Sequence, residues 1–207
     1  MTILDNTTIH VAAICGSLRG NGITRMALAY ALDGARELGA TTHLIDLREY
    51  DLVFCDGSSD YPADVQRLRR DVHEAQGFLI GTPVYHGSYS GVLKNALDLM
   101  GFREFEGRVV GLVGVAGGSS GAMVTLANLR TVFRSLHSWV VPDEVSISKS
   151  DSVFSSAGVC NDEPICDRLL NLGRQVARFS YLHHSDHTRE FVEMWETAAE
   201  NPGVSDS

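Results

Sequence analysis

The chain has 207 residues, with 17 Lys and Arg against 26 Asp and Glu, and its formal net charge is −9. This acidic balance argues against a general binder of nucleic-acid phosphates and against docking on an anionic membrane. No apolar run reaches the roughly 20 residues that cross a bilayer, and residues 1–10 lack the apolar core of a signal peptide. We therefore expect a cytoplasmic protein with one domain over 1–185 and a polar C-terminal tail over 186–207.

The cysteines show no CxxC spacing that would indicate a metal or redox motif; they are Cys15, Cys55, Cys160 and Cys166. A reducing compartment keeps such residues as thiols, so we expect four thiols, with Cys15 packed in an apolar strand. Pairing of Cys160 with Cys166 in an oxidising buffer is the less favoured alternative.

Apolar runs and helical periods alternate along the chain. In chain order they predict a strand over 9–15, a helix over 24–38, a strand over 42–47, a helix over 62–75, a strand over 78–82, a helix over 90–100, a strand over 109–116, a helix over 121–136, a strand over 139–147 and a helix over 162–182. The helix over 90–100 is the clearest, because Ser90 is a natural N-cap and Gly101 ends the apolar stripe.

Five apolar strands separated by helices predict an α/β fold, a parallel sheet covered on both faces. Five strands fit the flavodoxin-like three-layer sandwich with strand order 2-1-3-4-5. In that fold a ligand binds at the carboxyl ends of the strands, beside the switch between the first and third strands. The loops over 16–24, 82–90 and 116–121 lie there.

The loop over 16–24 leads into a helix N-terminus, where free N–H groups favour an anion. The Ser17 and Thr24 hydroxyls can donate hydrogen bonds, and Arg19 can clamp two phosphate oxygens. Neither GK[ST] nor G-x-G-x-x-G is present. A terminal phosphate site and an ordinary strand–helix turn with a surface arginine are both compatible with this loop alone.

The other two loops suit a flat ring. Pro83, which fixes the backbone, Val84, Tyr85, His86 and Gly87, which allows close approach, follow the third strand. For Tyr85 and His86 we favour a ligand contact over a plain capped turn. For Tyr89, packing or a subunit contact is favoured.

Gly117 and Gly118, after the fourth strand, can expose backbone N–H groups to a polar ring edge. A phosphate site beside a polar ring site describes FMN. A flexible turn explains the glycines equally well when that loop is taken alone.

Other polar residues carry less weight. Asp46 ends the second strand, where a dinucleotide fold places a ribose-binding acid, but the glycine fingerprint is missing. Arg130 and Arg134 could meet an NADPH phosphate or a partner, although a solvated helix face is the commoner explanation. The tail histidines, His183, His184 and His187, are interpreted as solvent-exposed, and no metal site is expected.

Three long strings resemble the NADPH-dependent FMN reductase family: Gly16 to Thr24, Thr82 to Asp98, and Ala116 to Arg134. Within that family the likeness is greatest to FMN-dependent azobenzene reductases, and it includes the terminal Asn201-Pro202-Gly203-Val204. The resemblance implies bound FMN, with phosphate held by Ser17, Arg19 and Thr24 and the ring along 83–87 and near 117–118. Gly22 stands where many relatives have serine, which implies one fewer phosphate hydroxyl.

The implied activity is that of an NAD(P)H oxidoreductase. Hydride passes from NADPH or NADH to FMN and then, in ping-pong order, to a quinone, azo compound, flavin or similar acceptor. The resemblance also implies a homodimer or homotetramer with the helix over 90–101 at the interface. That helix lacks the inserted bulky residue of the sulfonate-linked flavin reductases, which implies retained FMN.

Hydride transfer needs no side-chain acid or base, so no catalytic residue is assigned, although His86 could protonate a reduced acceptor. The alternative functions are a flavodoxin-like electron carrier and an FMN-binding sensor without turnover.

Overall fold

The computed structural model describes residues 7–198; the string Asn201-Pro202-Gly203-Val204 lies outside this part of the chain. The strands are β1 (His10–Cys15), β2 (Thr41–Asp46), β3 (Gly77–Pro83), β4 (Val109–Val115) and β5 (Trp139–Ile147). The helices are α1 (Ile23–Arg36), η1 (Leu47–Glu49), α2 (Ala63–His73), α3 (Gly91–Asp98), α4 (Phe102–Phe105), α5 (Met123–Ser135), η2 (Ser150–Ser152), α6 (Glu163–His184) and α7 (Asp186–Glu196). Among the described residues, no helix is long and apolar enough to cross a membrane.

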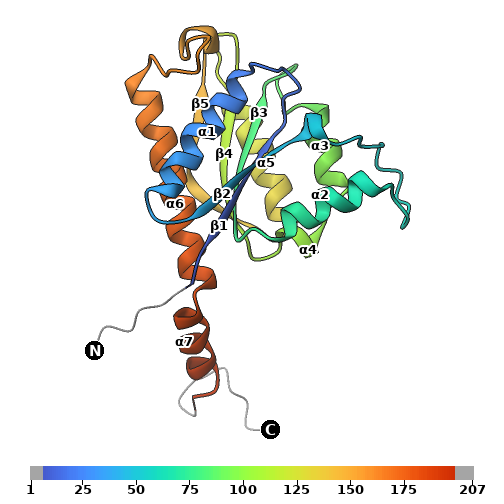
Figure 1. Ribbon diagram of the computed structural model, residues 1–207, viewed down its shortest axis with the longest axis vertical. Helices are drawn as coiled ribbons and strands as arrows, with labels where there is room; N and C mark the ends of the chain where they lie inside the picture. Colours follow the sequence, from blue (N-terminus) through green and yellow to red (C-terminus); the bar gives the residue numbers. More distant parts are fainter. Residues whose placement is uncertain (1–6, 199–207) are drawn as a thin grey trace.

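The sheet is parallel throughout, with strand order β2-β1-β3-β4-β5 (Figure 1). The predicted flavodoxin-like arrangement is therefore confirmed. Each predicted strand is present to within two residues at either end, because a strand buried on both faces is a continuous apolar run in the sequence. The register between β4 and β5 shifts between Val110 and Leu112.

Two helical layers cover the sheet, and alternate residues of β1 face them. Val11, Ala13 and Cys15 pack in the cluster that contains apolar residues of α1 and α6. Ala12 and Ile14 pack in the opposite cluster, which contains apolar residues of α2, α3 and α5. The core is thus divided by the sheet, and Cys15 is buried in it as expected.

Close packing of α1 against α6 depends on two glycines. A Cβ atom at Gly34 would collide with the backbone of Leu170, and one at Gly173 would collide with the backbone of Ala31. The two helices therefore approach at a distance that only glycine permits. This contact fixes the N-terminal half of α6 beside the helix that opens after the first loop.

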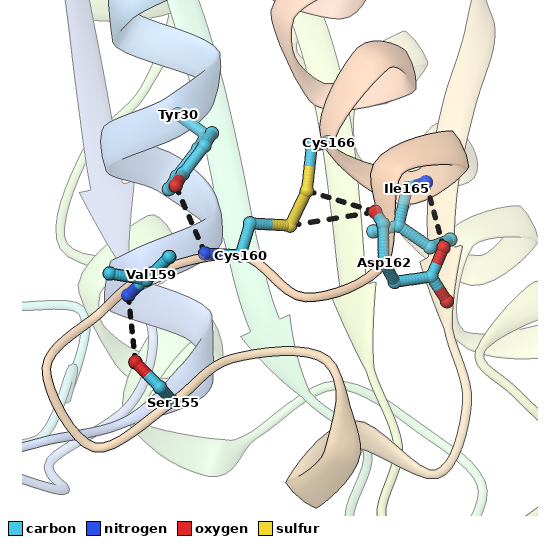
Figure 2. Close-up of a disulfide and its surroundings, with 7 residues drawn as sticks. All are labelled: Tyr30, Ser155, Val159, Cys160, Asp162, Ile165 and Cys166. Atoms are coloured by element: carbon cyan, nitrogen blue, oxygen red, sulfur yellow. Dashed lines mark hydrogen bonds between the residues drawn. A yellow bond between two sulfur atoms is a disulfide. The ribbon is translucent and has the colours of Figure 1, made fainter.

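Cys160 and Cys166 form a disulfide at the start of α6 (Figure 2), so the expectation that these two remain thiols is wrong. The loop before α6 folds back on itself through an antiparallel bridge between Phe154 and Cys160, which brings the two cysteine Cα atoms to 6.4 Å. The Tyr30 hydroxyl accepts a hydrogen bond from the Cys160 backbone N–H at 3.0 Å. Cys15 and Cys55 are free thiols.

The C-terminal helices differ from the sequence interpretation in two ways. Residues 186–196, expected only as part of a polar tail, form the separate helix α7, which projects beyond the end of α6 (Figure 1). His183 and His187 are exposed as expected, but His184 is half-buried. Burial and the nearby Arg108 guanidinium lower the pKa of His184 to about 4.

Candidate functional site

The three predicted loops, over 16–24, 82–90 and 116–121, meet at one end of the sheet. A cavity of about 340 Å³ lies between them, and its lining includes Ser17, Arg19, Thr24, Pro83, Val84, Tyr85 and Gly117. A second cavity of about 390 Å³ shares Val84 and Gly117 with the first and adds Gly87 and Gly118. Each exceeds the lower limit of about 300 Å³ for small-molecule sites. Nine of the ten candidate residues thus line this pair of cavities, and His86 lines neither.

The first loop ends in a helix N-terminus that no side chain caps. Gly22 is the N-cap residue of α1 and makes no side-chain capping bond. Ser17 and Thr24 are buried, and the Thr24 hydroxyl has no hydrogen-bond partner among the described residues. Uncapped N–H groups, two buried hydroxyls and the positive end of the helix dipole form a donor set for an anion.

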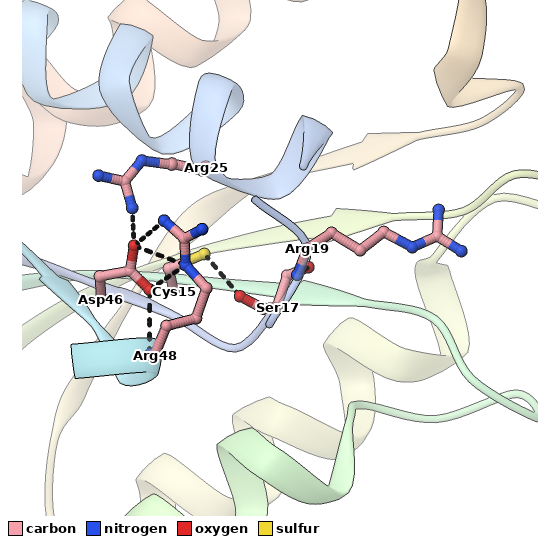
Figure 3. Close-up of polar contacts among 6 residues, drawn as sticks. All are labelled: Cys15, Ser17, Arg19, Arg25, Asp46 and Arg48. Carbon is pink, nitrogen blue, oxygen red and sulfur yellow. Dashed lines mark hydrogen bonds and ion pairs between the residues drawn. The ribbon is translucent and has the colours of Figure 1, made fainter. Parts of the chain in front are cut away.

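Arg19 is the cation of this loop that remains available to a ligand. Asp46, which is 2% exposed, accepts a hydrogen bond from Arg48 Nε at 3.0 Å and forms an ion pair with Arg25. Figure 3 shows Arg19 extending away from this group, and it makes no ion pair with any described residue. Asp46 therefore anchors its two neighbouring arginines instead of binding a ribose.

The first two loops are tied together by Ser90. Its hydroxyl caps α3 by accepting a hydrogen bond from the Leu93 N–H at 3.1 Å, and it donates to the Gly16 carbonyl at 2.6 Å. The Gly16 N–H in turn donates to the Gly81 carbonyl at 2.8 Å. These bonds hold the loop over 16–24 in a fixed position against the end of β3, so a ligand entering there would require little ordering of the loop.

A tight turn follows β3. Tyr85 and Ser88 exchange backbone hydrogen bonds of 2.9 and 3.1 Å, with His86 and Gly87 between them at φ of 51° and 82°. Two successive positive φ values characterise the type I′ turn. His86 thereby lies at the exposed tip, whereas Tyr85 lines the first cavity with 46% of its surface exposed. The turn offers a flat surface along Pro83, Val84 and Tyr85.

The third loop exposes backbone donors. The carbonyls of Ala116 and Gly118 accept hydrogen bonds from Ser150 and Lys149, while the N–H groups of Gly117 and Gly118 have no acceptor among the described residues. A Cβ atom at either glycine would meet nothing within 4 Å. The loop can therefore approach a planar ring and donate to its carbonyl edge.

Some residues that line the two cavities were not identified from the sequence. Ser150 and Asp151 in η2, just after β5, line the first cavity. Their position at the carboxyl end of the strand next to β4 is the signal that could have identified them. Arg130 forms an ion pair with Glu144 at 2.6 Å and donates to two carbonyls of β5, so it is part of the helix–strand packing.

The site fits FMN on its donor chemistry: an anion site at α1, a flat wall after β3, and free N–H groups after β4. Comparison with known proteins agrees. The family model described as NADPH-dependent FMN reductase matches residues 9–152.

Two curated relatives and one solved structure resemble this chain. An NADPH-dependent FMN reductase, ArsH of Shigella flexneri, is 28% identical over 86% of this chain and 71% of its own. An FMN-dependent NADPH-azoreductase of Staphylococcus aureus is 36% identical over 70% of this chain and 80% of its own. The solved flavoenzyme NAD(P)H:acceptor oxidoreductase FerB of Paracoccus denitrificans superposes with a TM-score of 0.71 at 23% identity, covering 85% of this chain and 99% of that one. At that identity the superposition establishes the fold.

Proposed function

The chain belongs to the NADPH-dependent FMN reductase family and is an FMN-dependent NAD(P)H oxidoreductase, and we propose that it retains FMN as a prosthetic group between the loops over 16–24, 82–90 and 116–121. The observation that carries the proposal is the donor set: the uncapped N-terminus of α1, the buried Ser17 and Thr24 hydroxyls and the unpaired Arg19. A phosphate monoester dianion satisfies all of these donors at once.

The chemistry that FMN supplies when bound is hydride acceptance from NAD(P)H and electron donation to a second substrate. The chain's part is orientation. Pro83, Val84 and Tyr85 would provide one wall for the ring, and the N–H groups of Gly117 and Gly118 would donate hydrogen bonds to its polar edge. Hydride transfer needs the reacting atoms about 3–3.5 Å apart, and a rigid wall supplies that geometry without an acid or base residue.

Donor and acceptor are proposed to use the same open side of the site in turn. The cavity meets solvent beside Tyr85, which is half-exposed. Flat acceptors such as quinones, azo compounds and flavins fit that opening. This order of use predicts ping-pong kinetics.

A homodimer or homotetramer with residues 90–101 at the interface is also proposed. A hollow of about 650 Å³ runs beside α3 and is lined by Gly91, Val92, Asn95 and apolar residues that include the highly exposed Phe54. An apolar hollow of this kind is typical of a surface that another chain covers. We propose in addition that the protein works in the cytoplasm, and that residues 1–185 form the reductase domain and 186–207 an appended tail.

The test measures two properties: retention of FMN by the protein and the pattern of its initial-rate kinetics. After loading with FMN and desalting, the protein should keep its flavin, and initial rates with NADPH and a quinone should give parallel double-reciprocal lines. Flavin that washes out would contradict the prosthetic role. Intersecting lines would contradict alternate use of one site.

A further inference from the structure

Helix α7 presents an apolar face that stays exposed in the part of the chain that the structure describes. None of its residues is buried, and Phe191 and Met194 are 63% and 66% exposed, with Val192 and Trp195 also exposed. Figure 1 shows the helix projecting from the body beyond α6. An isolated helix of eleven residues is marginal in water, and its stability comes from packing of an apolar face. The apolar face of α7 is therefore expected to pack against another surface.

The base of α7 is held rigidly. Ser185 is buried and caps the helix by accepting a hydrogen bond from the Thr188 N–H at 3.2 Å. The Asp186 N–H donates to the Thr7 hydroxyl at 3.2 Å, which fixes the start of α7 to the segment before β1. A single residue, Ser185, separates α6 from α7. Antiparallel packing of two helices needs a connection of 2–5 residues, so α7 cannot fold back along its own α6.

A groove of matching chemistry lies near that base. Its volume is about 340 Å³, and its lining is mostly apolar: Thr7, Ile9, Leu38, Gly39, Ala40, Ala177, Arg178, Tyr181 and Leu182. Leu38 and Leu182 are about half exposed. Arg178 on its rim is exposed and forms no ion pair with any described residue. The groove thus combines an apolar floor with one available cation.

The charges of α7 complement this groove. At helical spacing Glu190 lies beside Met194, and Glu196 lies beside Val192, so carboxylates border the apolar face on both sides. A face of this kind is repelled by anionic lipid and attracted to an apolar groove with an arginine at its edge.

We infer that α7 of one copy docks in the groove of a second copy, and that the exchange is reciprocal about a two-fold axis. The groove and the base of α7 share Thr7, so each arm starts beside the groove that receives the other. The exposed apolar side chains of one arm offer roughly 400 Å². Two arms with their two receiving surfaces then approach the about 1,600 Å² of a standard interface. This contact goes beyond the proposed function and lies apart from α3.

Cross-linking between singly substituted chains tests the docking directly. Met194→Cys and Leu38→Cys are made separately in a Cys55→Ser background, because Cys55 is the exposed free thiol. Mixing the two variants under mild oxidation should give a linked peptide that joins residue 194 of one chain to residue 38 of the other. Met194→Cys mixed with Val159→Cys is the control, since Val159 is similarly exposed but outside the groove. If the test pair links no better than the control pair, the proposal is overturned.

Analytical sedimentation of the wild type and of the double variant Phe191→Ser/Met194→Ser measures self-association independently of cross-linking. The double variant should raise the dissociation constant of the assembly at least tenfold, and Arg178→Glu should act in the same direction. Val159→Ser removes an exposed valine that lies outside the groove, α7 and residues 90–101, and it should leave association unchanged. Unchanged association in the double variant, or transfer of α7 to phosphatidylcholine vesicles in place of self-association, would refute the docking. Bleaching of bound FMN by NADPH should persist in all these variants, so failure here is distinguishable from failure of the reductase function.

Discussion

Replacing Arg19 by alanine should weaken FMN binding and leave the fold intact. Arg19 forms no ion pair with any described residue, so the substitution breaks no internal contact that stabilises the protein. In the complex it would remove charged hydrogen bonds to the phosphate, each worth about 1.5–3 kcal/mol. Because the side chain is exposed, water screens part of this energy. We expect a loss of about 2 kcal/mol, a roughly 30-fold rise in Kd.

The assay is titration of the apoprotein with FMN and with riboflavin, followed by flavin fluorescence at low salt. Riboflavin lacks the phosphate, so its affinity should be the same in the wild type and in Arg19→Ala. Arg36→Ala is the matched control, because Arg36 is also exposed but pairs with Asp33 at the far end of α1. Equal losses for both ligands, or an unchanged Kd for FMN, would refute the phosphate assignment.

Three further perturbations address stability. Ser90→Ala removes both the α3 cap and the bond to Gly16, and should lower the free energy of unfolding in urea by about 1–2 kcal/mol while weakening FMN binding. Cys160→Ser opens the loop closed with Cys166 over a separation of six residues and should cost about 2 kcal/mol, and dithiothreitol should produce a similar loss in the wild type. The pKa of His184 is lowered to about 4 against an ordinary 6.5. The unfolded chain therefore binds the proton first, and Tm should fall as the pH drops through that window, less steeply in His184→Gln.

Each of these three predictions can be contradicted by a specific result. FMN affinity unchanged in Ser90→Ala would show that the first loop holds its position without this tie. A wild-type protein whose unfolding is indifferent to dithiothreitol would show that the disulfide does not form in solution. Parallel Tm profiles for the wild type and His184→Gln would show that another group causes the acid loss.

The fold could be predicted from the sequence because its strands are buried on both faces. Each appears as a short apolar run bounded by glycine, proline or polar residues, and the alternation with helical periods leaves few topologies. The same reasoning located the three loops, because in this fold position follows from strand order. The sequence does not show which side chains of these loops line the cavities. His86 shows this, since the positive φ values of the turn carry it to the tip.

The missed features depend on contacts that no local pattern reveals. The disulfide forms because the loop before α6 folds back on itself, and a spacing of six is no recognised motif. The burial of His184 comes from packing against a distant segment that includes Arg108. Helix α7 did carry a local signal, Phe191 followed by Met194 and Trp195 at helical spacing, but the surrounding charges made the segment look like a polar tail.

The most direct test of the account is the visible spectrum of the FMN-loaded protein under anaerobic conditions, before and after one equivalent of NADPH. We predict a flavin spectrum that bleaches within seconds and returns when a quinone is added. Bound flavin that NADPH leaves oxidised would contradict the reductase function. Failure of the protein to take up FMN at all would contradict the assignment of the three loops.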